Sequence, residues 1–321
     1  MNNRFEGWYF RHQQGDTLLS LIAGRSQESA FVQVVTNRAS YHVPYPIGAF
    51  AHDATPQGRS SRRDDIAPYK TITAAYSESS SKTSCDEPRK KSDVGFGTVH
   101  IGENRFAESS VTLDIRTADL RLTGELRYGP WVPLRYDIMG PFRFLPMECR
   151  HSVFSLLHRV EGQVSLNGAL LRFDHGTGYA EGDRGRSFPS RYAWLQWGDL
   201  EARASVMLSI ARIPLAGFRF WGCIAVVWVN GQEYRLATYL GAQIRRMDER
   251  HMEIVQGRWN LKAEVLGDGA GCPLQAPDNG KMNRVIHENV GVKARIWFGE
   301  MEKDGKALLA VEGVLAGVEV V

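Results

Sequence analysis

The sequence predicts an all-β protein with little helix. Three observations carry this prediction. Short apolar or alternating runs rich in valine, isoleucine and aromatic residues recur along the chain, glycine-bearing turns separate them, and a sustained period of about 3.6 residues is missing. Many short strands with glycine in their turns are typical of β-barrels and β-sandwiches.

The first strands are expected near the start of the chain. Residues 5–36 read as three strands broken by glycines, and residues 41–50 continue in an extended style. Pro44 and Pro46 confine this last piece to a sheet edge or a loop, because proline has no amide hydrogen to donate to a neighbouring strand.

The composition changes sharply at residues 54–95. This tract is polar, rich in serine and dense in both charges. Such a sequence buries too little apolar surface to offset the entropy of ordering, so we expect a disordered insertion that extends a hairpin loop. Its basic cluster could be a docking site, but the composition favours a solvated linker.

Strand patterns resume after the insertion. They are expected at residues 98–101, 110–115, 119–126, 153–159, 161–166, 169–173, 192–197, 204–213, 218–229, 232–239, 243–247, 251–256, 259–266, 294–298 and 307–321. The Asn230-Gly231 step predicts a tight hairpin, since both residues suit positive φ values. Residues 130–146 are rich in proline and aromatics, so we interpret them as a packed connection between two β lobes. Helix is limited to one short piece at residues 282–287.

Bulk composition excludes several classes of protein. The 321 residues suffice for one large or two ordinary domains, and the formal charge of +3 is too small to indicate a nucleic-acid surface. Four scattered cysteines without a CxxC pair argue against a zinc site or a disulfide framework and favour buried free thiols. No apolar run suits a signal peptide or a spanning helix, so we expect a cytoplasmic protein.

The most unusual passage is GYAEGDRGRSFPSRYAWLQW at residues 178–197. It combines carboxylates, arginines and large aromatic side chains in a turn-rich context. Exposed aromatics need a reason and buried charges need partners. We therefore interpret the passage as a loop and strand folded over the mouth of a cavity, with any chemistry close by.

This passage resembles the segment that marks the tocopherol cyclase family, in which a Gly-Tyr-x-Glu-x-Asp-Trp-Gly run leads into Ser-Phe-Pro and an aromatic strand. Three other stretches agree with that family: FEGWYFRHQ at residues 5–13, PMECRHSV at 146–153 and LQAPDNGKMNRVIHE at 274–288. The resemblance implies two lipocalin-like antiparallel β-barrel or sandwich lobes. We divide them into residues 1–145 and 146–321.

The resemblance also implies a reaction. A prenylated hydroquinone closes a chromanol ring when its tail alkene is protonated at the less substituted carbon and the phenolic oxygen captures the tertiary cation, a step of vitamin E biosynthesis. Such an isomerase needs an acid, a cavity that folds the tail and exclusion of water, but no cofactor and no metal. The expected partner is a lipophilic prenyl-quinol-type molecule; peripheral contact with a membrane and the oligomeric state are left open.

Four residues are candidates for the acid. Glu181 and Asp183 point to one side of an extended segment, so one carboxyl group could keep the other neutral; alternatively, both pair with nearby arginines and only close the loop. Glu148 and His151 could form a buried acid with its hydrogen-bonded partner, or a satisfied pair that joins the lobes.

Aromatic side chains are candidates for substrate contact, because their faces stabilise cations by up to about 2 kcal/mol when desolvated. Large aromatics are more often core than site. The candidates, with the carboxylate that adjoins them, are Glu6, Trp8, Tyr9, Tyr179, Phe188, Tyr192 and Trp194.

Arg184 departs from the family pattern, which usually has tryptophan there. An arginine that lined the cavity would make it more polar and repel a cation, whereas one that points outward would leave the cavity intact. In the last motif Asp278, Arg284 and Glu288 are interpreted as parts of a structural clasp between the lobes.

Two other functions remain open. A lipocalin-like binding protein would hold a hydrophobic molecule without chemistry, and only the enzyme requires a carboxyl group of raised pKa inside the cavity. A carbohydrate-active β protein would need two carboxyl groups about 5 to 10 Å apart across an open groove.

Overall fold

The computed structural model describes residues 4–53, 96–215, 217–267, 271–301 and 306–321. Within these ranges nearly every element is a strand, and helix is confined to three short 3-10 turns, Ile47–Ala49, Gly140–Phe144 and Thr238–Leu240. The all-β prediction is confirmed. The insertion predicted at residues 54–95 lies outside the described residues.

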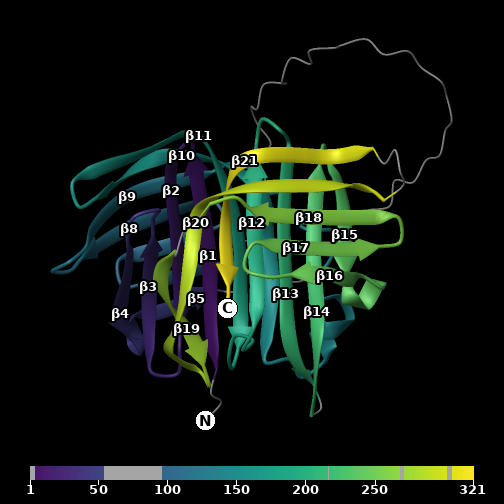
Figure 1. Ribbon diagram of the computed structural model, residues 1–321. Coiled ribbons are helices and arrows are strands. Elements are labelled where there is room, and N and C mark those ends of the chain that lie inside the picture. The colour runs from purple at the N-terminus through teal and green to yellow at the C-terminus, as the bar shows by residue number, and fades with distance from the viewer. Residues whose placement is uncertain (1–3, 54–95, 216, 268–270, 302–305) are drawn as a thin grey trace, which may run out of the picture.

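Two large antiparallel sheets lie side by side and hold the described strands (Figure 1). The first sheet contains β1 (Phe5–Gln14), β2 (Thr17–Arg25), β3 (Ser29–Val35), β4 (Ser40–Pro46), β5 (Phe50–Asp53), β6 (Thr98–Ile101), β7 (Asn104–Ala107), β8 (Ser110–Arg116), β9 (Arg121–Tyr128), β10 (Cys149–Leu166) and β11 (Ala169–Gly185). The second contains β12 (Tyr192–Asp199), β13 (Ala204–Leu215), β14 (Phe218–Val229), β15 (Gln232–Ala237), β16 (Gln243–Met247), β17 (His251–Gln256), β18 (Trp259–Val265), β19 (Cys272–Asp278), β20 (Lys281–Glu300) and β21 (Ala307–Val320).

Both sheets are meanders closed by one long-range join. In the first sheet β11 returns beside β1, and in the second β21 returns beside β12. The two joins meet in the middle of the molecule, where Tyr9 of β1 and Trp194 of β12 have ring centroids 5.5 Å apart (Figure 1). The predicted Asn230-Gly231 hairpin is confirmed, because it links β14 to β15 with φ values of 50° and 88°.

The chain passes from the first sheet to the second between β11 and β12. Residues 130–146 therefore connect β9 to β10 within the first sheet, and do not connect the lobes as predicted. They do pack against the second sheet, where Arg235 of β15 donates hydrogen bonds to the backbone carbonyls of Tyr136 (2.8 Å) and Asp137 (2.7 Å). The division of domains at residue 146 stays a prediction.

The helix predicted at residues 282–287 is wrong, because these residues begin β20. Met282, Arg284, Ile286 and Glu288 are more buried than the exposed residues between them. A burial period of two is the pattern of a strand, and pairing with β19 satisfies its backbone.

Three apolar clusters stabilise this architecture. One fills the first lobe around Phe10 and Phe106, and one fills the second lobe around Leu208 and Phe298. The third lies between the sheets and includes Trp194. A candidate site at the junction of the lobes is therefore surrounded by packed apolar side chains.

Arg11 of β1 ties the two sheets together through this junction. Its side chain is 2% exposed, and its Nη2 donates hydrogen bonds to the carbonyl oxygens of Val290 in β20 and Leu315 in β21, each at 3.0 Å. A buried guanidinium that satisfies backbone carbonyls of both strands fixes the distance between the lobes.

Two other expectations concern helices and cysteines. None of the described helices is long and apolar enough to cross a membrane. Cys149, Cys223 and Cys272 are free thiols that are buried or half-buried. Cys85 lies outside the described residues.

Candidate functional site

A cavity of about 160 Å³ lies between the two sheets, and the half-exposed Phe188 and Met282 lie on its wall. Most of its wall is apolar. The polar side chains on the wall are Tyr9, Gln33, Glu148, Cys149, His151, Glu181, Asp183, Tyr192, Ser209, Gln275 and Glu319.

The pleat of the strands decides which residues face this cavity. On β1 Tyr9 faces it, and Trp8 faces the core of the first lobe. On β11 Glu181 and Asp183 face it, whereas the next residue, Arg184, is exposed and does not line it. The passage predicted as a loop and strand over the mouth consists of the end of β11, a loop at residues 186–191 and most of β12.

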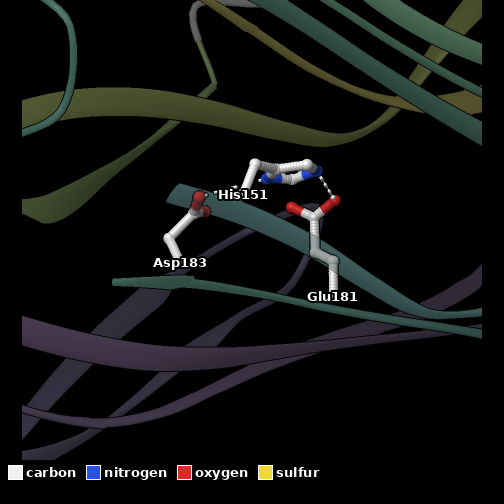
Figure 2. Close-up of side chains that lie close together, drawn as sticks. All are labelled: His151, Glu181 and Asp183. Carbon is white, nitrogen blue, oxygen red and sulfur yellow. Dashed lines mark hydrogen bonds and ion pairs between the residues drawn. The ribbon is translucent and has the colours of Figure 1, made fainter. Parts of the chain in front are cut away.

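His151 bridges two carboxyl groups on the cavity wall (Figure 2). Its Nδ1 donates a hydrogen bond to Oδ1 of Asp183 at 3.1 Å, and its Nε2 lies 3.3 Å from Oε2 of Glu181. Neighbouring antiparallel strands place the three residues, because His151 and Asp183 are register partners of β10 and β11. The cluster therefore follows from strand pairing.

The charges around His151 decide its protonation. Burial lowers the pKa of this histidine, but the carboxylates of Glu181 and Asp183 raise it more, to well above the ordinary value. The ring is therefore an imidazolium at neutral pH. The predicted alternative, pairing of these acids with arginine, does not occur in the described residues; Arg186 lies 3.5 Å from Asn279 instead.

The same three side chains also offer donor atoms within 4.8 Å of one another, which is a donor set of the kind that binds a divalent cation. However, the imidazole turns a different nitrogen to each carboxyl group. One ion could take only one of these nitrogens, so the ring would have to rotate. The observed geometry fits a proton on each ring nitrogen better than a metal.

Glu181 is also held by two aromatic donors. Its Oε2 accepts a hydrogen bond from the hydroxyl group of Tyr179 at 2.5 Å and from Nε1 of Trp194 at 3.2 Å. Glu181 is 6% exposed and Tyr179 is 1% exposed. Tyr179 thus lies behind the wall and orients the carboxyl group that faces the cavity.

Glu288 is a second buried acid. Its side chain is fully buried, and Oε1 accepts a hydrogen bond from the hydroxyl group of Tyr9 at 2.5 Å. Its Oε2 has no hydrogen-bond partner among the described residues. Burial and the negative charge of Glu181 raise the pKa of Glu288 to about 7. The hydrogen bond from Tyr9 and the positive charge of Arg11 lower this pKa and offset only part of the rise.

Glu319 is the third acid and faces the cavity directly. It accepts a hydrogen bond from the hydroxyl group of Tyr192 at 2.6 Å. Burial and then the negative charge of Glu288 raise the pKa of Glu319 well above its ordinary value. Burial and the charge of Glu288 therefore favour the protonated form of a carboxyl group on the wall of a mostly apolar cavity.

The structure brings most of the predicted site residues together. The residues that line the cavity are Tyr9, Glu148, His151, Glu181, Asp183, Phe188, Tyr192 and Trp194. Trp8 instead packs against Phe50 and His52 in the first lobe, and Glu6 forms an ion pair with Arg25 at 3.1 Å, so neither contacts the cavity. Both faces of β1 are buried, so the sequence alone does not show which of two neighbouring residues points toward the cavity.

Two predicted groupings differ from the structure. The hydrogen-bond partner of His151 is Asp183 and not Glu148, whose side chain is exposed just before β10. The last motif does join the lobes, since Gln275 of β19 exchanges hydrogen bonds with Gln33 of β3 at 2.8 and 2.9 Å. Glu288, assigned there only a structural role, belongs to the acidic cluster.

Sequence reasoning missed Glu319 altogether. The signal that could have found it is a single acid at an inward position of the apolar run GVEVV, since an unpaired charge inside such a strand has to be explained.

Comparisons with known proteins agree with this fold. No protein-family profile matches the sequence, and no curated protein is similar to it in sequence. Among solved structures, CghA with Sch210972 is similar with a TM-score of 0.58 at 10% identity, covering 99% of this chain and 88% of that chain. CghA alone gives 0.55 at 11% identity, with coverage of 99% and 88%. Kievitone hydratase from Nectria haematococca gives 0.48 at 9% identity, with coverage of 99% and 89%. At such identities the likeness to the two CghA structures establishes the fold alone.

Proposed function

We propose that this protein is a tocopherol cyclase-like isomerase, which closes an oxygen ring on a prenylated hydroquinone by protonating its tail alkene. The observation that carries this proposal is Glu319, a carboxyl group that faces an apolar cavity and has a pKa raised well above its ordinary value. A binding protein has no need of such a group, whereas an acid catalyst does.

The surrounding residues suit the charge that develops in this reaction. When Glu319 transfers its proton to the alkene carbon, positive charge appears on the neighbouring carbon. Glu181 and Asp183, with one imidazolium between them, carry a net negative charge toward the cavity. Negative charge in an apolar, water-poor site stabilises a cation strongly. Trp194 also lines the cavity, and an aromatic ring there can further stabilise a cation.

The size of the cavity bears on how a substrate would lie. An apolar cavity of about 150 Å³ holds a benzene ring, so about 160 Å³ accommodates the reacting ring and little more. The rest of a prenyl tail would leave through the mouth. Phe188, a half-exposed residue of the cavity wall, provides apolar contact for it.

Exposed aromatic side chains support contact with a lipid surface, from which such a substrate would come. Phe144, beside the cavity-lining Phe142, and Phe218, at the start of β14, are 75% and 79% exposed. Arg143 lies over the ring of Phe144 at 4.6 Å. Exposed aromatics with arginine are typical of proteins that lie on anionic membranes.

The experiment is incubation of the protein with a phytylated methyl hydroquinone, followed by chromatography for the isomeric chromanol. Cyclisation leaves the mass unchanged, so retention time and absorbance identify the product. We expect product from the protein and from Glu312→Gln, an exposed position on the same strand as Glu319. Glu319→Gln should lose it.

Two outcomes would contradict the proposal. Undiminished product with Glu319→Gln would remove this residue as the acid. Absence of product with retention of the hydroquinone during gel filtration would establish the runner-up, a lipocalin-like binding protein. The carbohydrate-active alternative fits poorly, because the oxygens of Glu181 and Asp183 lie within 4.8 Å on a single strand and do not face each other across a groove.

A further inference from the structure

Tyr9 and Glu288 are joined by a hydrogen bond, and the proposed protonation of the alkene by Glu319 uses neither of them. We propose that Tyr9 and Glu288 form a second proton-transfer site, which removes the proton from the substrate's hydroxyl group as its oxygen bonds to the carbocation. This inference rests on the proposed function and extends it, because it assigns a base and thereby a class of nucleophile, a phenol or alcohol.

The geometry links the cavity to a fully enclosed acid. Tyr9 lines the cavity, while Glu288 lies behind it with no exposed surface. The hydroxyl group of Tyr9 is 2.5 Å from Oε1 of Glu288, and it is also 2.9 Å from the hydroxyl group of Ser20. Within the part of the chain that the structure describes, the hydrogen bond from Tyr9 connects the carboxyl group of Glu288 to a residue of the cavity wall.

The second oxygen of Glu288 makes the arrangement unusual. A buried carboxyl oxygen normally has a hydrogen-bond partner, since leaving it unpaired costs about 1–3 kcal/mol. Oε2 of Glu288 has none among the described residues. Buried polar groups kept at such a cost are more common at sites of chemistry than in structural cores.

Several charged groups act on Glu288. They are Tyr9 and Arg11 of β1, Glu181 of β11, Cys272 of β19 and Glu319 of β21. Burial and the charge of Glu181 raise the pKa of Glu288 to about 7, against the lowering effects of the Tyr9 hydrogen bond and of Arg11. Burial and the charge of Glu288 raise the pKa of Tyr9 well above its ordinary value. Tyr9 thus stays a neutral phenol that can pass a proton on, and Glu288 is partly ionised near neutral pH, which suits a general base.

The proton balance of the whole reaction is closed. Glu319 gives a proton to the alkene, whose π electron pair forms the new C–H bond. The substrate oxygen donates a lone pair to the resulting cation, forming the C–O bond. As it does so, its proton moves to the oxygen of Tyr9, and the proton of Tyr9 moves to Glu288. One proton has left Glu319 and one has reached Glu288, and exchange with solvent restores both.

The test uses two variants and two controls in the full-length protein. Tyr9→Phe removes the relay, and Glu288→Gln keeps a hydrogen-bond acceptor but removes the base. Tyr128→Phe deletes another buried phenol, which binds His12 at 2.6 Å inside the first lobe. Glu312→Gln makes the same replacement of a carboxylate by an amide at an exposed position, and it is the control for Glu288→Gln. Circular dichroism and thermal unfolding select variants that are folded.

The first measurement is the cyclisation rate against pH. General acid–base groups contribute about 10²- to 10⁴-fold, so Tyr9→Phe and Glu288→Gln should each lower the rate at least about a hundredfold. Glu288→Gln should also remove the rise in rate on the acidic side of neutrality. Undiminished rates or an unchanged pH profile in both variants would overturn the proposal.

The second measurement does not depend on cyclisation. An alkylated 4-nitrophenol, whose phenolate absorbs visible light, is bound at neutral pH. We expect phenolate in the unchanged protein and in both controls, and its loss in Tyr9→Phe and Glu288→Gln, because only the intact pair accepts the proton. Equal phenolate in all variants would overturn the proposal. Phenolate without any cyclisation would leave this pair supported and the proposed function refuted.

Discussion

Asp183 and His151 are cross-strand partners of β11 and β10, and their side chains are joined by a hydrogen bond of 3.1 Å. A register pair of this kind depends on the alignment of the two strands as a whole. The charge on the cavity wall is therefore as rigid as the sheet that carries it. This has consequences for titration as well as for catalysis.

Asp183→Asn should lower the pKa of His151, because it removes one of the two carboxylates that oppose the effect of burial. The measurement is an NMR titration of the histidine ring protons in both proteins. The resonance of His175, which is exposed and bonded to Glu161, should not move and serves as the control. An unchanged His151 titration would mean that Glu181 alone sets its charge.

The same shift predicts how stability depends on pH. A histidine whose pKa is raised on folding contributes stability that is fully present below its ordinary value of about 6.5 and is lost as the pH rises through the raised value. Asp183→Asn should therefore be most destabilised relative to the unchanged protein at acidic pH. The two free energies of unfolding should converge at alkaline pH.

The free energy of unfolding of Glu288→Gln, relative to that of the unchanged protein, should also rise with pH. The pKa of Glu288 rises from 4.5 to about 7 on folding, so the unchanged protein loses stability as the pH rises through this window. Glutamine does not titrate. The variant should gain up to about 3 kcal/mol relative to the unchanged protein between pH 4.5 and pH 8, at 1.36 kcal/mol per unit of pKa. Urea unfolding at several pH values tests this, and parallel curves would contradict it.

The strands were predictable because their signals are local. Alternation of apolar and polar residues, and the Asn230-Gly231 turn, act within a few residues. The pairing of His151 with Asp183 was not, since it depends on the register of β10 with β11, and the two residues are 32 positions apart along the chain. That register shifts at bulges in β10, which no periodicity reveals.

Long-range contacts also hid the glutamates. The bonds from Tyr9 to Glu288 and from Tyr192 to Glu319 cross 279 and 127 residues. The resemblance pointed to several residues that line the cavity. It could not show which residues of a strand buried on both faces point toward the cavity. The sequence therefore predicted that both Trp8 and Tyr9 face the cavity, whereas of these two neighbours only Tyr9 does.

Arg11→Met should destabilise the protein by about 3 kcal/mol, because it leaves the carbonyl groups of Val290 and Leu315 without their buried donor. Arg25→Met is the matched control. Its ion pair with Glu6 is substantially exposed, so its loss should cost less than about 1 kcal/mol. Both values come from denaturant unfolding. Equal effects of the two substitutions would show that Arg11 does not tie the sheets together.

Contact with lipid should depend on the exposed aromatic side chains of Phe144 and Phe218. Phe144→Ser combined with Phe218→Ser should reduce sedimentation with vesicles of anionic phosphatidylglycerol, because both side chains are more than 70% exposed and would enter the interface. Neutral phosphatidylcholine vesicles should bind the unchanged protein more weakly, since Arg143 contributes positive charge. Leu170→Ser, an exposed apolar residue of β11 that does not line the cavity, is the control. Equal sedimentation of the double variant and this control would place lipid contact elsewhere.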